Sequence, residues 1–307
     1  MSKENKMFKM LMLATVISGT ASAQTLNIVT DIAPMTGIAS AIGAEHVHIE
    51  QLIENGASAH HFNLKPSNIK AIETADIIIL SGPSLLPGLV ERIESIAPNS
   101  DIIIGENIQN TVHFELSQTH EHDDDHDHDA HQTAIDPHMW LLAENAKRWA
   151  QHIADQFNNR APQHRASFDT NLDAFSAAVD TFTLNAPKID HDTVIGFSHD
   201  AFQYALHDFG HAEKIIFSNA FAQAPSVKEI VELETILETS PPLCIIVDPN
   251  EPSKVAEQFA RGFNIPTFDV SPIFGDGTNH SNAYLDLYAT VIAGFRKCLD
   301  GKTENSH

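Results

Sequence analysis

The feature that most constrains the fold is a regular alternation of short β-branched runs and longer helical segments along most of the chain. The runs Leu26–Thr30, 76–80 and 101–104 are rich in Ile, Val and Leu, which is typical of strands buried on both faces. Strands that alternate with helices predict parallel sheets covered by helices on both faces. The chain is long enough for two such units.

The longest predicted helix lies in the middle of the chain, within residues 161–187. Its apolar positions recur at helical spacing, at Phe168, Leu172, Phe175, Val179 and Phe182. A helix of about twenty residues is about 30 Å long, the width of a small lobe. The expected fold is therefore α/β with two lobes, 24–160 and 188–307, each a mostly parallel sheet flanked by helices. The long helix is expected to join them as a rigid link.

The first 23 residues are predicted to be a signal peptide. Three lysines precede a short apolar stretch at 10–17, and Ala21-Ser22-Ala23 has the small residues of a cleavage site. The apolar stretch is too short to span a bilayer. No cysteine lies near the predicted cleavage site, so no lipid anchor is expected there. These features predict export to the periplasm as a soluble protein.

The charge of the chain limits its partners. The formal net charge is −23, which argues against binding nucleic acid or an anionic membrane face and suits a protein that concentrates cations. The chain also has 19 histidines, far more than an ordinary fold requires.

One segment, 113–135, contains a dense run of histidines and acids and almost no residue that could join a core. Its clustered histidines are His120, His122, His126, His128 and His131. Imidazoles and carboxylates at this spacing favour a divalent cation such as zinc, so we interpret the run as a mobile, loose metal collector. The alternatives are a solvated polar loop or a cloned tag, but a tag would lie at a terminus and would not be half aspartate.

Three other histidines lie where open α/β sheets bind ligands, in loops after strands or at helix starts. His60 follows the predicted strand 47–53, His138 enters a helix at Trp140, and His199 is expected to start a helix after strand 193–197. Three neutral imidazoles suit tetrahedral zinc. Spacing alone does not establish this site, because a lone histidine at a helix start is more often a surface or capping residue.

The chain has two cysteines, Cys244 and Cys298. In an exported protein, an even pair suggests a disulfide, here between a strand at 243–247 and the last helix. Two free buried thiols are the alternative.

Three sequence motifs surround the candidate ligands and resemble a known family. They are Gly56-Ala57-Ser58-Ala59-His60 with Leu64-Lys65-Pro66-Ser67, then Asp136-Pro137-His138-Met139-Trp140-Leu141, and Phe197-Ser198-His199-Asp200-Ala201-Phe202. In this order they resemble the metal-binding motifs of the periplasmic solute-binding proteins of zinc and manganese ABC importers, most closely the ZnuA-type zinc proteins. The histidine-rich loop and the cysteine pair also match that type.

The resemblance implies that His60, His138 and His199 bind Zn²⁺, that a rigid helix links two lobes, and that the metal is delivered to a membrane permease. Manganese members usually have a carboxylate where this chain has His199, so imidazole there favours zinc. For the fourth position we expect water, with His61, His280 and Ser271 as weaker candidates. Many members place an acid where this chain has Ser271, and some zinc members have a carboxylate where it has Ala59.

Two other functions are alternatives to a receptor that delivers zinc to a permease. An exported zinc hydrolase or lyase needs a general base beside the metal, and the chain has no His-Glu-x-x-His helix and no Gly-x-Ser-x-Gly elbow. Asp200, next to His199, is expected to cap a helix or orient a ligand. A zinc buffer or chaperone would fit the composition but would not account for a cleft between two lobes. We therefore expect a monomeric receptor without enzyme activity, and a periplasmic zinc chaperone is a further candidate partner.

Overall fold

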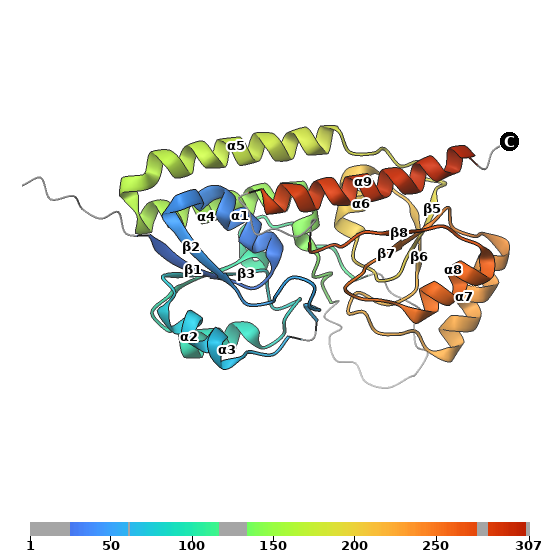
Figure 1. Cartoon of the computed structure of the whole chain (residues 1–307), viewed down its shortest axis with the longest axis horizontal. Coiled ribbons are helices and arrows are strands. Elements are labelled where there is room, and N and C mark those ends of the chain that lie inside the picture. Colours follow the sequence, from blue (N-terminus) through green and yellow to red (C-terminus); the bar gives the residue numbers. More distant parts are fainter. Residues whose placement is uncertain (1–24, 61, 117–133, 275–281, 305–307) are drawn as a thin grey trace, which may run out of the picture.

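The computed structural model describes residues 25–60, 62–116, 134–274 and 282–304, and it contains two four-stranded sheets side by side (Figure 1). The strand order is β2-β1-β3-β4 in the first sheet and β6-β5-β7-β8 in the second, and every neighbouring pair is parallel. Helices cover both faces of each sheet (Figure 1). The predicted α/β class is confirmed.

The first lobe is built from the amino-terminal half of the chain. Its strands are β1 (Leu26–Thr30), β2 (Val47–Gln51), β3 (Ile77–Leu80) and β4 (Asp101–Ile104). Its helices are α1 (Ala33–Gly43), α2 (Pro66–Thr74), α3 (Leu89–Ile96) and α4 (Ala143–Arg160). Every residue of β3 is buried, as expected for a central strand of a parallel sheet.

The second lobe repeats this plan with shorter strands. Its strands are β5 (Val194–Phe197), β6 (Glu213–Ile216), β7 (Ile245–Val247) and β8 (Thr267–Asp269). Its helices are α6 (Gln203–Phe209), α7 (Val227–Thr239), α8 (Lys254–Phe263) and α9 (Ala283–Glu304).

Two long helices hold the lobes together on the side away from α2, α3, α7 and α8 (Figure 1). Helix α5 (Arg165–Leu184) packs on α1 and α4, and its predicted apolar stripe is buried at Phe168, Leu172, Phe175 and Val179. Helix α9 also packs against α1, although it belongs to the second lobe. One continuous apolar core therefore extends through both lobes, an arrangement that opposes large rigid-body separation.

Helix α3 starts at Leu89, directly after Pro87 and Gly88, and Gly88 has φ +76°, outside the helical region. Helix α6 begins later than the sequence indicated. His199 does not start a helix, since α6 begins at Gln203. The backbone N–H of Asp200 instead donates to the carbonyl of Ser218, which holds the segment in an irregular turn.

A disulfide joins Cys244, just before β7, to Cys298 in α9, which confirms the predicted pair. The predicted signal peptide and the histidines of the 113–135 segment from His120 to His131 lie outside the described residues. Within the part of the chain that the structure describes, no helix has the length and apolar character needed to cross a bilayer.

Candidate metal centre

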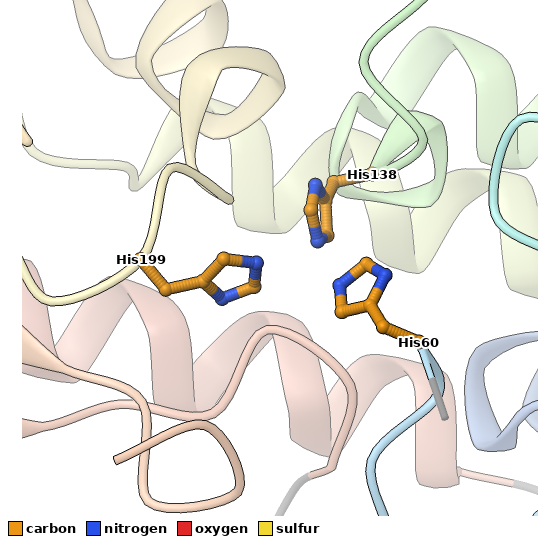
Figure 2. Close-up of side chains that lie close together, drawn as sticks. All are labelled: His60, His138 and His199. Atoms are coloured by element: carbon orange, nitrogen blue, oxygen red, sulfur yellow. The ribbon is translucent and has the colours of Figure 1, made fainter. Parts of the chain in front are cut away.

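The three histidines come from three separate parts of the chain and meet between the lobes (Figure 2). His60 lies in the loop between β2 and α2, a loop that turns at Gly56 with φ +83°. His138 immediately precedes a short 3-10 helix, and His199 lies two residues beyond the end of β5. His138 and His199 are fully buried, whereas His60 is half-buried.

The rings of the three histidines are close enough to share one ion. One ligand atom from each residue lies within 4.8 Å of the other two. Figure 2 shows that each imidazole turns one nitrogen towards the space that they share. Nitrogens bound to tetrahedral zinc at 2.0–2.1 Å are about 3.4 Å apart. The geometry therefore fits zinc after an inward shift of about 1 Å by the ligand loops.

His138 is oriented by a carboxylate from its own turn. Oδ1 of Asp136 accepts hydrogen bonds from the backbone N–H of His138 at 2.9 Å and from its Nδ1 at 2.8 Å. With a proton on Nδ1, the Nε2 lone pair points into the shared space, and Nε2 has no hydrogen-bond partner among the described residues. Burial holds the pKa of His138 well below its ordinary value, so this imidazole is neutral and ready to bind a cation.

Burial also raises the pKa of Asp136, to about 7. Of its two carboxyl oxygens, Oδ2 has no hydrogen-bond partner among the residues that the structure describes. A buried negative charge in this condition is costly unless a cation lies nearby. A divalent ion on His138 would supply that positive charge.

His199 has a similar carboxylate partner from a different strand. Its Nδ1 lies 3.3 Å from Oδ2 of Asp248, directly after β7, and its Nε2 lies 3.2 Å from the carbonyl oxygen of Ala220. Oδ1 of Asp248 accepts from the backbone N–H of Asn250. A metal on Nε2 has to replace the contact with Ala220.

Residues from the second lobe fix the turn that carries His138. The indole Nε1 of Trp140 donates to the carbonyl of Pro272 at 2.7 Å, and the hydroxyl of Tyr284 donates to the carbonyl of Trp140 at 2.7 Å. The hydroxyl of Tyr204 donates to the carbonyl of Asp136. Because all three side chains are buried or nearly so, they hold His138 at a fixed distance from the second lobe.

The remaining sequence candidates have different positions. Oγ of Ser271 accepts hydrogen bonds from Nδ2 of Asn250 and from the backbone N–H groups of Ile273 and Phe274, so it stabilises its own turn. A ligand role for Ser271 stays a prediction. Asp200 pairs with Lys214 at 3.1 Å, and it does not cap α6. His61 and His280 lie outside the described residues.

The sequence pattern did not indicate the roles of Asp248 and Asp136. Asp248 follows β7 at the same edge of the sheet where His199 follows β5, and neighbouring parallel strands end together. The sequence shows that both residues follow strands, but only the strand order shows that the two strands are neighbours. Asp136 was noted only as part of a motif.

The chain matches, over residues 28–298, the family described as zinc-uptake complex component A, periplasmic. It is 24% identical to the high-affinity zinc uptake system protein ZnuA of Yersinia pestis over 319 residues, covering 97% of this chain and 100% of the relative. It is also 24% identical to the protein of the same description from Brucella abortus (strain 2308), covering 94% of this chain and 96% of the relative.

The fold is that of known solute-binding proteins. A structure of the solute-binding protein FpvC from Pseudomonas aeruginosa in complex with Mn²⁺ aligns with a TM-score of 0.76 at 18% identity, covering 91% of this chain and 100% of that one. A crystal structure of ZnuA aligns with a TM-score of 0.74, also at 18% identity, over 91% of this chain and 99% of that one.

The family match, together with the two parallel sheets and a histidine cluster that could hold a metal ion, places the chain among the metal-binding solute-binding proteins. Within that class, the chain belongs to the zinc-uptake complex component A family.

Proposed function

We propose that the protein is a periplasmic receptor that captures Zn²⁺ through His60, His138 and His199 and delivers it to the permease of an ABC importer. The observation that carries this proposal is the convergence of three imidazoles between the lobes, two of them buried. The family description, a component of a zinc-uptake complex, supports a transport role, and the sequence has neither of the two hydrolase motifs considered above.

The donor set supports zinc as the cargo. Three imidazole nitrogens form a borderline-soft site, whereas harder manganese favours carboxylates. The carboxylates of Asp136 and Asp248 contact the Nδ1 atoms of His138 and His199, so the Nε2 atoms are the ones that would bind the metal, on His199 after its contact with the carbonyl of Ala220 is replaced. A water molecule in the fourth position completes tetrahedral zinc, and it would leave with the ion on transfer.

The proposal also covers the path of the metal. The net charge of −23 attracts hydrated cations from the periplasm, and the 113–135 segment is proposed to hold them weakly before they reach the three histidines. The shared core and the packing of α9 on α1 support release through the loop that carries His60. A monomer is expected, and a periplasmic zinc chaperone would act upstream of the same site.

The test is a competition titration with zinc on the mature protein and on His60→Ala, His138→Ala and His199→Ala. His207→Ala is the matched control, because the side chain of His207 is 53% exposed and lies on α6, outside the cluster. Each of the three changes should weaken the tight site by at least about 100-fold, whereas the control should bind as the unchanged protein does.

Survival of tight binding in all three variants would overturn the assignment and favour a zinc buffer based on the 113–135 segment. A tight site that prefers manganese would instead favour a manganese receptor of the same fold.

A further inference from the structure

The loop between β6 and α7 contacts two of the three candidate ligands from one side. The carbonyl oxygen of Ala220 lies 3.2 Å from Nε2 of His199. The next residue, Phe221, places its ring edge-to-face against His60, with centroids 5.9 Å apart and planes at 81°. Residues 220 and 221 thus touch one ligand from each lobe.

His60 is the ligand with the weakest anchoring by secondary structure. It lies in a loop and is half-buried, whereas His138 precedes a short helix and His199 follows a strand. The ring of Phe221 comes from the opposite lobe, so it restricts His60 from the side of the second sheet. Edge-to-face aromatic pairs have a defined geometry that limits rotation of both rings.

A turn capped by the side chain of Asn219 holds Phe221 in place. Oδ1 of Asn219 accepts from the backbone N–H groups of both Phe221 and Gln223 at 3.0 Å. Ala222 has φ +56°, a left-handed conformation that a residue with a Cβ seldom adopts. Such conformations persist where surrounding contacts fix them, and they concentrate at functional sites. The turn is therefore built to present Phe221 at one position.

We propose that Phe221 is a positioning residue for the zinc site: it holds the His60 imidazole towards His138 and His199 and so slows the departure of zinc. Phe221 does not bind the metal. It acts through His60, and the Asn219 turn acts through Phe221. The inference rests on the proposed function, because it requires His60 to be a ligand.

The test is a double-mutant cycle between the two residues, measured by zinc competition titration and by stopped-flow transfer of zinc to a chelator. Phe221→Ala should weaken zinc about three- to tenfold, mostly through faster dissociation, because that range matches an aromatic pair. In a His60→Ala background, Phe221→Ala should change zinc affinity by less than about twofold. Phe221→Leu should recover part of the loss, since it restores apolar volume without the ring.

Two further measurements separate positioning from a general loss of structure. Cobalt bound in place of zinc should show altered visible absorption in Phe221→Ala, because the His60 nitrogen shifts. Phe182→Ala is the matched control: Phe182 is also a partly buried phenylalanine, but it lies on α5, outside the metal cluster. It should leave the cobalt spectrum and the zinc dissociation rate unchanged.

An equal loss of affinity in both backgrounds, or no loss in either, would overturn the role of Phe221. If His60→Ala itself leaves zinc binding unchanged, the proposed ligand set fails, which is a different result. The cycle therefore distinguishes an error in the inference from an error in the proposed function.

Discussion

The carboxylate of Asp136 provides the sharpest quantitative prediction about zinc binding. Its Oδ1 receives both hydrogen bonds from His138, at 2.8 and 2.9 Å, and the side chain is 1% exposed. Asp136→Asn keeps an oxygen acceptor and nearly the same volume at this position. It removes the negative charge that stabilises a cation bound at Nε2 of His138.

The expected loss follows from this geometry. Removing a hydrogen-bonded partner of a metal-binding histidine lowers metal affinity by about 10- to 100-fold, or about 1.4–2.8 kcal/mol. Because water does not reach the pair to screen the charge, we expect the upper half of that range, about 30- to 100-fold. Asp136→Ala should cost more, since it also leaves the backbone N–H of His138 without an acceptor.

The assay is zinc competition titration at neutral pH, with Asp208→Asn as the matched control. Asp208 is also a largely buried carboxylate, and its Oδ2 accepts hydrogen bonds from the backbone N–H of Ala143 and the hydroxyl of Tyr288. Among the described residues, the partners of Asp208 do not include His60, His138 or His199. Its variant should therefore bind zinc within about threefold of the unchanged protein. Equal affinity for Asp136→Asn and the unchanged protein would refute the reasoning.

Three further predictions concern stability. Burial raises the pKa of Asp31 from 3.8 to about 6. A raised carboxyl pKa means that the folded state binds the proton more tightly than the unfolded state does. The contribution of Asp31 to the free energy of unfolding therefore increases as pH falls from about 7 towards 4. When pH is lowered from 7.5 to 5, the free energy of unfolding of the unchanged protein, measured in urea, should rise by about 1.4 kcal/mol relative to Asp31→Asn. A relative fall over the same pH range would refute this. Gly37→Ala should destabilise the protein by about 1–3 kcal/mol, because its Cβ would lie 2.5 Å from the backbone nitrogen of Tyr284 where α1 meets α9; an unchanged thermal midpoint would contradict that packing. Replacing Cys244 and Cys298 together by alanine should cost about 2–4 kcal/mol, with zinc affinity retained in the folded protein, and a selective loss of zinc binding would show that the disulfide shapes the site.

Much of the fold could be predicted because local patterns determine it. The strands Leu26–Thr30 and Asp101–Ile104 have the expected bounds, since flanking turn residues and apolar runs define them. The sequence did not predict the late start of α6. Its cause is a backbone hydrogen bond from Asp200, in the loop after β5, to Ser218, in the loop after β6. No local pattern reports such a contact.

The site shows the same division between local and long-range information. The resemblance of three motifs identified His60, His138 and His199, which the structure brings together. The contacts of Asp248 with His199 and of Phe221 with His60 depend on which strands and lobes are neighbours. The packing of α9 on α1 was also unexpected, because the sequence indicated a single helix as the link between the lobes.

The most direct test of the zinc site is X-ray absorption at the zinc edge, on mature protein loaded with one equivalent of zinc. The structure predicts three imidazole nitrogens at about 2.0–2.1 Å, one fewer imidazole in His60→Ala, and no sulfur ligand. A spectrum that stays the same when His60, His138 and His199 are all replaced by alanine would show that zinc binds elsewhere on the chain.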